Sequence, residues 1–218
     1  MNEILFFIHI LFVVAFLLGS LRIGKEALMT FVVMQSIIAN LFVVKQMILF
    51  QKDVTCADVY IVGSILGMNL LQEYFGRDTA KKTMWISFFC MIFFTVISRL
   101  HVSYAPNSFD TSQNAFMTIL SQTPRIFLAS LATFFIVQRF DIMFFTFLKK
   151  IFKDKYLTLR VFLSMIVSQL MDTIFFSYAG LYGIVPSMMD IVLVSFVIKV
   201  VIILALTPFT KLSRRLVV

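Results

Sequence analysis

Few residues of this sequence are charged, cysteine or histidine, and each shortage excludes a class of protein. Charged residues make up 14% of the 218 positions, whereas a typical soluble domain has about 25%. The two cysteines, Cys56 and Cys90, have no CxxC spacing, which excludes a disulfide scaffold and argues against a zinc or redox role. The two histidines are isolated, and no G-x-x-x-x-G-K-[ST] phosphate loop occurs. ATP hydrolysis by way of such a loop is therefore excluded.

Apolar residues are correspondingly abundant in the sequence. They make up 61% of the chain, and the mean hydropathy is +0.98. No soluble fold of this size has enough interior to hide that much apolar surface from water. The sequence therefore predicts a single integral membrane domain over residues 1–218, an all-α polytopic bundle, and excludes a soluble enzyme.

Seven stretches are long and apolar enough, or nearly so, to cross a bilayer, which takes about 20 residues. They are 4–21, 29–50, 58–75, 84–98, 115–148, 161–182 and 190–210. The third and fourth are short, so either could be tilted, broken or re-entrant. The fifth is too long for one crossing, and Pro124 is expected to separate an approach helix from the span proper.

The positive charges alternate between the linkers. Thirteen lysines and arginines lie in the linkers 21–28, 76–83 and 149–160 and in the tail, and two lie in the alternate segments. This pattern predicts seven crossings of a cytoplasmic (inner) membrane with the C-terminus in the cytoplasm. It also accounts for the net charge of +8 without a nucleic-acid partner. Six spans plus a re-entrant hairpin is the alternative. The first stretch is not expected to be a cleaved signal, because its positive charges follow the apolar run.

Polar residues inside apolar stretches are costly in lipid and are the first candidates for function. Asp172 and Lys199 each lie about eleven residues, or about 17 Å, from the cytoplasmic end of their stretches. We therefore expect an ion pair or a shared pocket at mid-depth. Gln169, Ser164 and Ser168 lie close to Asp172 on the same helix. The alternative is a buried salt bridge that only fixes helix register.

A second group of polar residues lies near the inner end of the third stretch: Asn69, Gln72 and Glu73. Glu73 could bind a ligand, or it could form a surface pair with Arg77 one turn later. Gly63 and Gly67 lie on another face, which is expected to pack against a helix of this chain or of a second copy.

The remaining candidates lie in the second and fifth stretches. Asn40 is expected near the bilayer centre, whereas Lys45 could instead reach the headgroups. Arg125 follows the proline and is a candidate site residue. Gln138, Arg139 and Asp141 are expected to be interfacial anchors.

The order of these polar residues resembles that of a known family. The residues that carry the resemblance include Ala39-Asn40-Leu41-Phe42-Val43-Val44-Lys45, Leu71-Gln72-Glu73-Tyr74-Phe75-Gly76, Arg125, Ser168-Gln169, Asp172-Thr173, Lys199 and Pro208. Over residues 30–210 the chain resembles the queuosine precursor transporter family, also called the vitamin uptake transporter family. Many members carry Asp and Asn where this chain has Asn69 and Gln72.

The resemblance implies import of a 7-deazaguanine (queuine, preQ0 or preQ1) for tRNA modification, without a cofactor. Glu73 and Asp172 would then be the carboxylates for the purine edge or an amine. The amides of Asn40, Asn69, Gln72 and Gln169 would contact the purine edge, with Ser168 and Arg125 nearby. Lys45 and Lys199 would be charge partners. Bases stacked on Phe or Tyr typically gain about 1–3 kcal/mol.

Three other functions are weighed against import. The first is a substrate-capture subunit of an ATP-driven energy-coupling-factor transporter, since such subunits are also small, helical and basic. An intramembrane enzyme would need a nucleophile–base pair or metal ligands at membrane depth, and none is evident. A scaffold would gain little from central polar residues. The expected partners are the small-molecule substrate, the lipid bilayer and, through Gly63 and Gly67, a second copy in a homodimer.

Overall fold

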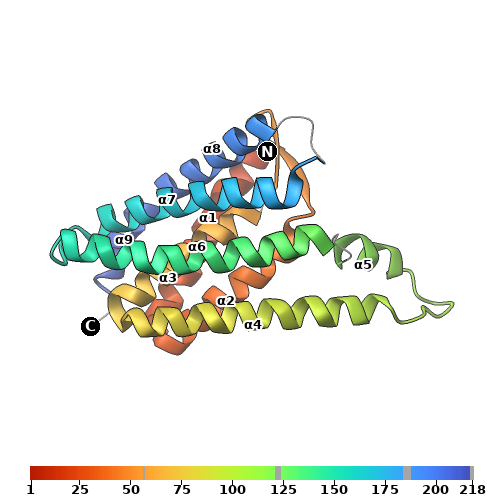
Figure 1. Ribbon diagram of the computed structural model, residues 1–218, viewed down its shortest axis with the longest axis horizontal. Coiled ribbons are helices and arrows are strands. Elements are labelled where there is room, and N and C mark those ends of the chain that lie inside the picture. Colours follow the sequence, from red (N-terminus) through yellow and green to blue (C-terminus); the bar gives the residue numbers. More distant parts are fainter. Residues whose placement is uncertain (56, 121–123, 184–187, 217–218) are drawn as a thin grey trace.

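The apolar stretches fold into helices, as a chain in lipid must to satisfy its backbone hydrogen bonds. The computed structural model describes residues 1–55, 57–120, 124–183 and 188–216. Seven long helices within these ranges form an elongated bundle (Figure 1): α1 (Asn2–Ile23), α2 (Lys25–Phe42), α3 (Ala57–Phe75), α4 (Arg77–Val102), α6 (Pro124–Ile151), α7 (Leu157–Phe176) and α8 (Met188–Leu206). The shorter elements are β1 (Gln46–Leu49), β2 (Lys52–Thr55), α5 (Gln113–Leu120), a π-helical turn (Ser177–Leu181), a 3-10 turn (Thr207–Phe209) and α9 (Thr210–Ser213).

The number of spans depends on α3. Six helices of the described ranges are long and apolar enough to cross a membrane, and α3 is not among them. Yet α3 has 19 residues, about 28 Å of helix, and contacts α1, α2, α4, α6, α7 and α8. Fourteen of its residues are buried. Because protein rather than lipid surrounds α3, this helix can cross the bundle without apolar side chains on every face.

The fourth span, expected to be short, is part of the 26-residue helix α4. The expected break in the fifth stretch is confirmed, since α5 ends at Leu120 and α6 begins at Pro124. The arrangement is therefore a polytopic helical bundle, with six spans by hydropathy and a seventh helix at its centre.

The second stretch differs from the prediction. The helix ends at Phe42, and residues 46–55 form an antiparallel hairpin in which Met47 pairs with Val54. Phe50 and Gln51 close the turn with φ values of 49° and 61°, a pair that suits a two-residue hairpin loop. Hydropathy alone cannot tell a short apolar strand from a helix. Asn40 therefore lies in the last turn of α2 and not at mid-depth.

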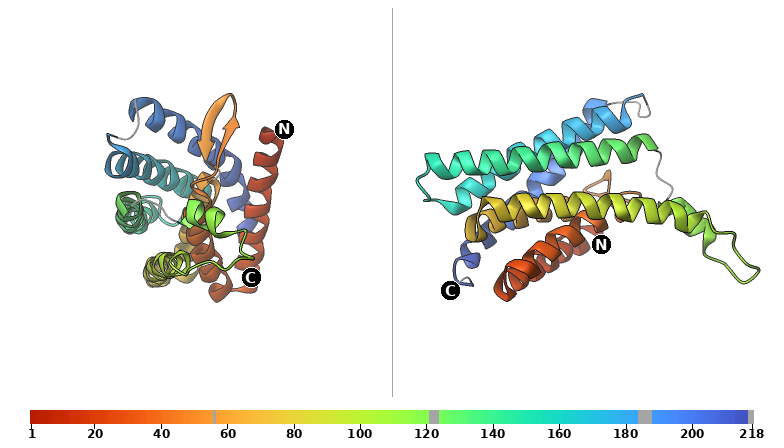
Figure 2. Two further views of the ribbon diagram at one scale, coloured as in Figure 1. Left: turned by 90° about the vertical axis from the view of Figure 1, so that its right-hand side faces the viewer. Right: turned by 60° about the horizontal axis from the view of Figure 1, so that its bottom comes forward.

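The bundle has two distinct ends, here called the hairpin end and the C-terminal end. At the hairpin end, Asn2 Nδ2 donates to the Ile48 carbonyl at 2.8 Å, and β1 and β2 lie between α1 and α8 (Figure 2). At the C-terminal end, the hydroxyls of Tyr74 and Ser213 are 2.8 Å apart. The basic linkers 21–28, 76–83 and 149–160 lie at this second end (Figure 1). The positive charges that alternate along the sequence are therefore gathered at one end of the bundle.

Gly63 and Gly67 pack within the chain. A Cβ at position 63 would collide with Gln35 of α2, and one at position 67 would lie 2.5 Å from Val32 Cγ2. The prediction of a helix-packing face is confirmed, and its partner is this chain's own α2 together with α1. The face is thus not available to a second copy, which removes the argument for a homodimer that rested on it.

Gly67→Ala is expected to lower the thermal unfolding midpoint of the detergent-purified protein. Overpacking against Val32 costs about 1–3 kcal/mol, which exceeds the roughly 1 kcal/mol that alanine gains in helix propensity. Gly19→Ala on α1 is the matched control, because nothing lies within 4 Å of its Cβ position. It should keep or raise the midpoint. Equal midpoints for the two variants would contradict the close approach of α2 and α3.

Candidate functional site

A cavity of about 510 Å³ lies in the half of the bundle nearer the hairpin. Its walls come from the last turns of α2, from β2, from the first turns of α3, from the first half of α6, and from the facing ends of α7 and α8. Ligand pockets of known proteins span about 300–1,000 Å³ and often lie between helices of a bundle. The cavity thus has the size and place of a small-molecule site.

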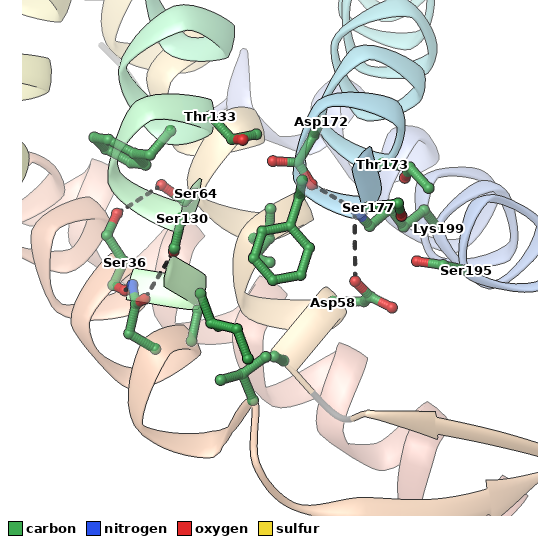
Figure 3. A pocket seen from close by; sticks show the side chains of 18 of the residues that line it. Ser36, Asp58, Ser64, Ser130, Thr133, Asp172, Thr173, Ser177, Ser195 and Lys199 are labelled. Atoms are coloured by element: carbon green, nitrogen blue, oxygen red, sulfur yellow. Dashed lines mark hydrogen bonds and ion pairs between the residues drawn. The ribbon is translucent and has the colours of Figure 1, made fainter. Parts of the chain in front are cut away.

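An ion triad forms one wall of the cavity (Figure 3). Lys199 Nζ of α8 lies 2.5 Å from Asp172 Oδ2 of α7 and 3.6 Å from Asp58 Oδ1 of α3. The side chain of Lys199 is 3% exposed, and those of Asp58 and Asp172 are 11% and 15% exposed. The predicted Asp172–Lys199 pair is confirmed, and it lines a cavity rather than only joining two helices.

Asp58 was missed by the sequence analysis. It lies in the first turn of α3, where an acidic residue looks like the boundary of a span. The signal in the sequence was that Asp58 falls within the apolar stretch 58–75, and the structure places it with Ile61 and Ser64 at the cavity wall.

The triad carries an excess of negative charge. Two carboxylates share one ammonium, and burial makes an uncompensated charge costly. Lys52 also lines the cavity, but its side chain is exposed at the edge and is screened by solvent. The buried part of the site is therefore suited to a cationic group or a proton.

The opposite wall carries the hydroxyls of Ser36, Ser64 and Ser130 (Figure 3), and the amide of Asn40 also lines the cavity. Asn40 Nδ2 donates to the Ser36 carbonyl at 2.9 Å, and Ser130 Oγ donates to Asn40 Oδ1 at 3.0 Å. The hydroxyls of Ser36 and Ser64 are 3.3 Å apart. These bonds hold Asn40 at the cavity wall, as its candidate role requires, although it lies nearer the hairpin end than expected.

Aromatic and neutral polar side chains complete the lining. Phe134 of α6 and Phe176 of α7 both face the cavity, which therefore has rings available for stacking. Gln138 also lines it and is 3% exposed. The prediction that Gln138 is an interfacial anchor is wrong, because α6 turns this residue into the bundle and not toward a headgroup.

Two predicted site residues lie outside the cavity near the hairpin end. Lys45 is exposed in the turn between α2 and β1, which fits the alternative that it reaches the headgroups. Arg125 is exposed, and its Nε donates to the Ala179 carbonyl at 3.1 Å. Arg125 thus ties the start of α6 to the π-helical turn after α7.

Glu73 lies at the C-terminal end and pairs with neither Arg77 nor the triad. Arg160 binds it through two hydrogen bonds of 2.8 and 2.9 Å, and Lys149 Nζ is 3.3 Å away. The expectation that Glu73 and Asp172 converge on one ligand is therefore wrong. The sequence analysis placed Arg160 in a linker, whereas its side chain is 0% exposed.

Glu73, Arg160 and Lys149 are here called the ion cluster. Four further candidates are buried between the cavity and the ion cluster: Ser168, Gln169, Asn69 and Gln72. The hydroxyl of Ser168 donates to Asp141 at 2.7 Å. Asp141 is 0% exposed, so the prediction that it is an interfacial anchor is wrong.

Membrane-length helices around a cavity with a buried ion triad and a few further polar side chains in a mostly apolar lining are the arrangement of a small-molecule membrane transporter. The comparisons with known proteins agree. The chain belongs to the vitamin uptake transporter family, because the family described as "Putative vitamin uptake transporter" matches residues 55–213. A protein of Bacillus subtilis (strain 168) named "Probable queuosine precursor transporter" is 30% identical over 213 residues, 96% of this chain and 92% of that protein. The predicted family is confirmed.

No solved structure significantly matches this chain. The expected similarity to energy-coupling-factor subunits therefore stays a prediction.

Proposed function

We propose that this chain imports 7-deazaguanine precursors of queuosine across the cytoplasmic membrane. The basic linkers gathered at the C-terminal end support a cytoplasmic location for that end. The cavity then lies in the outer half of the bundle, and the described conformation faces outward. Family membership and the Bacillus subtilis relative support the transporter class and, by name, the queuosine precursors.

The observation that carries the proposal is the pair of facing polar walls in one cavity. A guanine-like ring has N–H donors on one edge and a carbonyl acceptor beside them. The carboxylates of Asp58 and Asp172 can accept from the donors, and Lys199 or the hydroxyl wall can donate to the carbonyl. Phe134 and Phe176 can stack on the faces of the ring. Each edge and face of a flat, hydrogen-bonding heterocycle thus has a partner of suitable chemistry.

The excess carboxylate of the triad fits a further feature of these precursors. Queuine and preQ1 carry a cationic amine on a methylene arm attached to the ring, whereas preQ0 carries a neutral nitrile. A cationic arm placed beside Asp172 and Asp58 would balance the buried charge. We therefore propose that this chain prefers the amine-bearing precursors.

The test combines binding and transport by the purified chain. In a thermal-shift titration, queuine and preQ1 should raise the unfolding midpoint, because a ligand at 100 times its Kd stabilises the folded state by about 2.7 kcal/mol. Guanine, which lacks the arm, should raise it less. No shift with queuine, preQ0, preQ1 or guanine would contradict the proposed substrate.

Liposome uptake distinguishes import from substrate capture. The purified chain alone should accumulate or exchange labelled queuine in liposomes. A protein that binds queuine but transports it only with an added ATPase module would instead be a capture subunit of an energy-coupling-factor transporter.

A further inference from the structure

A layer of buried polar side chains lies between the cavity and the C-terminal end. It consists of Asn69 and Gln72 on α3, Asp141 on α6 and Gln169 on α7, with Gln138 where the layer meets the cavity. All five are at most 4% exposed. This layer, here called the inner layer, is separate from the ion triad.

Gln72 and Asp141 of the inner layer lie where α3, α6 and α7 pack together. Gln72 Nε2 donates to the Ile142 carbonyl at 3.0 Å, next to Asp141 in the chain. Ser164 and Ser168 of α7 donate to Asp141 Oδ1 at 2.6 and 2.7 Å. Asn69 lies one turn before Gln72, and Gln169 follows Ser168. Asn69 and Gln169 are thus buried on α3 and α7 within one turn of this junction, and Gln138 lies one turn from Asp141 on α6.

The inner layer has hydrogen-bonding capacity that the protein does not use. Within the described residues, seven of its buried atoms have no partner: both amide atoms of Asn69 and of Gln169, and one oxygen each of Gln72, Gln138 and Asp141. Buried polar groups of native proteins are nearly always paired, so a group left unpaired needs an explanation. The unpaired atoms include both amide donors and oxygen acceptors, the two kinds of group that a heterocycle edge needs.

The inner layer is closed toward the C-terminal end by the Glu73–Arg160 pair. Arg160 also donates to the carbonyls of Lys155 and Asp154, at 2.9 and 3.2 Å. Glu73 directly follows Gln72 on α3, so the closure begins where the inner layer ends. The outer cavity, the inner layer and the ion cluster thus follow one another along the bundle.

We propose that the inner layer is a second binding station for the transported 7-deazaguanine. This inference rests on the proposed function and adds a path: the base leaves the outer cavity past Gln138 and bonds to Asn69, Asp141 and Gln169. Opening of the Glu73–Arg160 pair then releases it at the C-terminal end. Residues of the inner layer act on translocation and not on capture from outside.

Gln169→Met and Asn69→Leu test the inner layer, because each replaces an unpaired amide by an apolar group of similar size. Uptake of radiolabelled queuine by variant liposomes should fall at least tenfold. Queuine affinity of the purified variants, measured by thermal-shift titration, should stay within about threefold of wild type, since the outer cavity is intact. The unfolding midpoint without ligand should not fall, because removing an unsatisfied buried group can be neutral or stabilising.

Leu170→Met is the matched control, since Leu170 neighbours Gln169 on α7 but is 38% exposed. It should leave uptake and affinity unchanged. Wild-type uptake by both inner variants would overturn the second station, and so would a loss of affinity equal to the loss of uptake. A fall in midpoint that parallels the loss of uptake would make the layer structural and would also overturn it. If wild-type protein neither bound nor transported queuine, the proposed function itself would fail.

Discussion

Asp172→Asn is expected to reduce uptake of preQ1 roughly 10- to 100-fold and to change uptake of preQ0 much less. A hydrogen bond to a charged group contributes about 1.5–3 kcal/mol, and each 1.4 kcal/mol is about tenfold in affinity. Only preQ1 has the ammonium that would lose this bond. The fold should survive, because Lys199 keeps Asp58 as a counter-ion at 3.6 Å. The measurement is competitive uptake of the two labelled precursors at equal protein level.

Asp58→Asn is the companion variant, since it removes the other carboxylate and leaves the shorter Lys199–Asp172 pair. It should reduce preQ1 uptake by a smaller factor. Ser195→Ala is a control at the same cavity that keeps all three charges of the triad. Equal losses of preQ0 and preQ1 uptake in Asp172→Asn would contradict a role for the excess negative charge in selecting amine-bearing precursors.

The sequence predicted those features that follow from depth along a single straight helix. Asp172 and Lys199 were paired because each lies about eleven residues from the same membrane face. Counting residues gives the depth of a side chain reliably where the helix is continuous. Helix α7 is continuous through Asp172, and α8 is continuous through Lys199. The break at Pro124 was predicted for a similar reason, because proline acts locally on the backbone.

Features that depend on which helices are neighbours could not be predicted in this way. Glu73 was expected either to bind a ligand or to pair with Arg77 one turn later, yet its partner Arg160 lies 87 positions further along the chain. Asp141 was placed at a headgroup because its distance from the helix end allowed it. Only packing against Ser164 and Ser168 reveals that it faces inward.

The hairpin and α3 show a second limit, that of hydropathy itself. Apolar strand residues extended the second stretch beyond Phe42, so the hairpin was merged with a span. Conversely, α3 is too polar for the hydropathy criterion, although it is the most enclosed helix of the described bundle. The hydropathy of a helix reflects its contact with lipid. A helix surrounded by other helices has little contact with lipid, so its hydropathy can be low.

Arg160→Met is expected to destabilise the protein strongly. Its side chain is fully buried, forms a two-bond pair with Glu73, and lies 5.4 Å from the centre of the Phe145 ring. Removing one partner of a buried pair costs about 3–5 kcal/mol, because the other charge is left uncompensated. Lys149 at 3.3 Å compensates Glu73 only in part, since its side chain is one-third exposed. The thermal unfolding midpoint in detergent should fall by roughly 10 °C.

Arg77→Met tests the surface pair that was the alternative expectation for Glu73, since Arg77 is exposed one turn after Glu73. It should leave the midpoint unchanged. The double variant Glu73→Met/Arg160→Met removes both charges and should recover much of the stability lost in Arg160→Met, because apolar groups can replace a buried ion pair at little cost. The same double variant lacks the closure at the C-terminal end and should release queuine trapped in liposomes faster than wild type. A midpoint that falls with Arg77→Met but not with Arg160→Met would contradict the closure altogether.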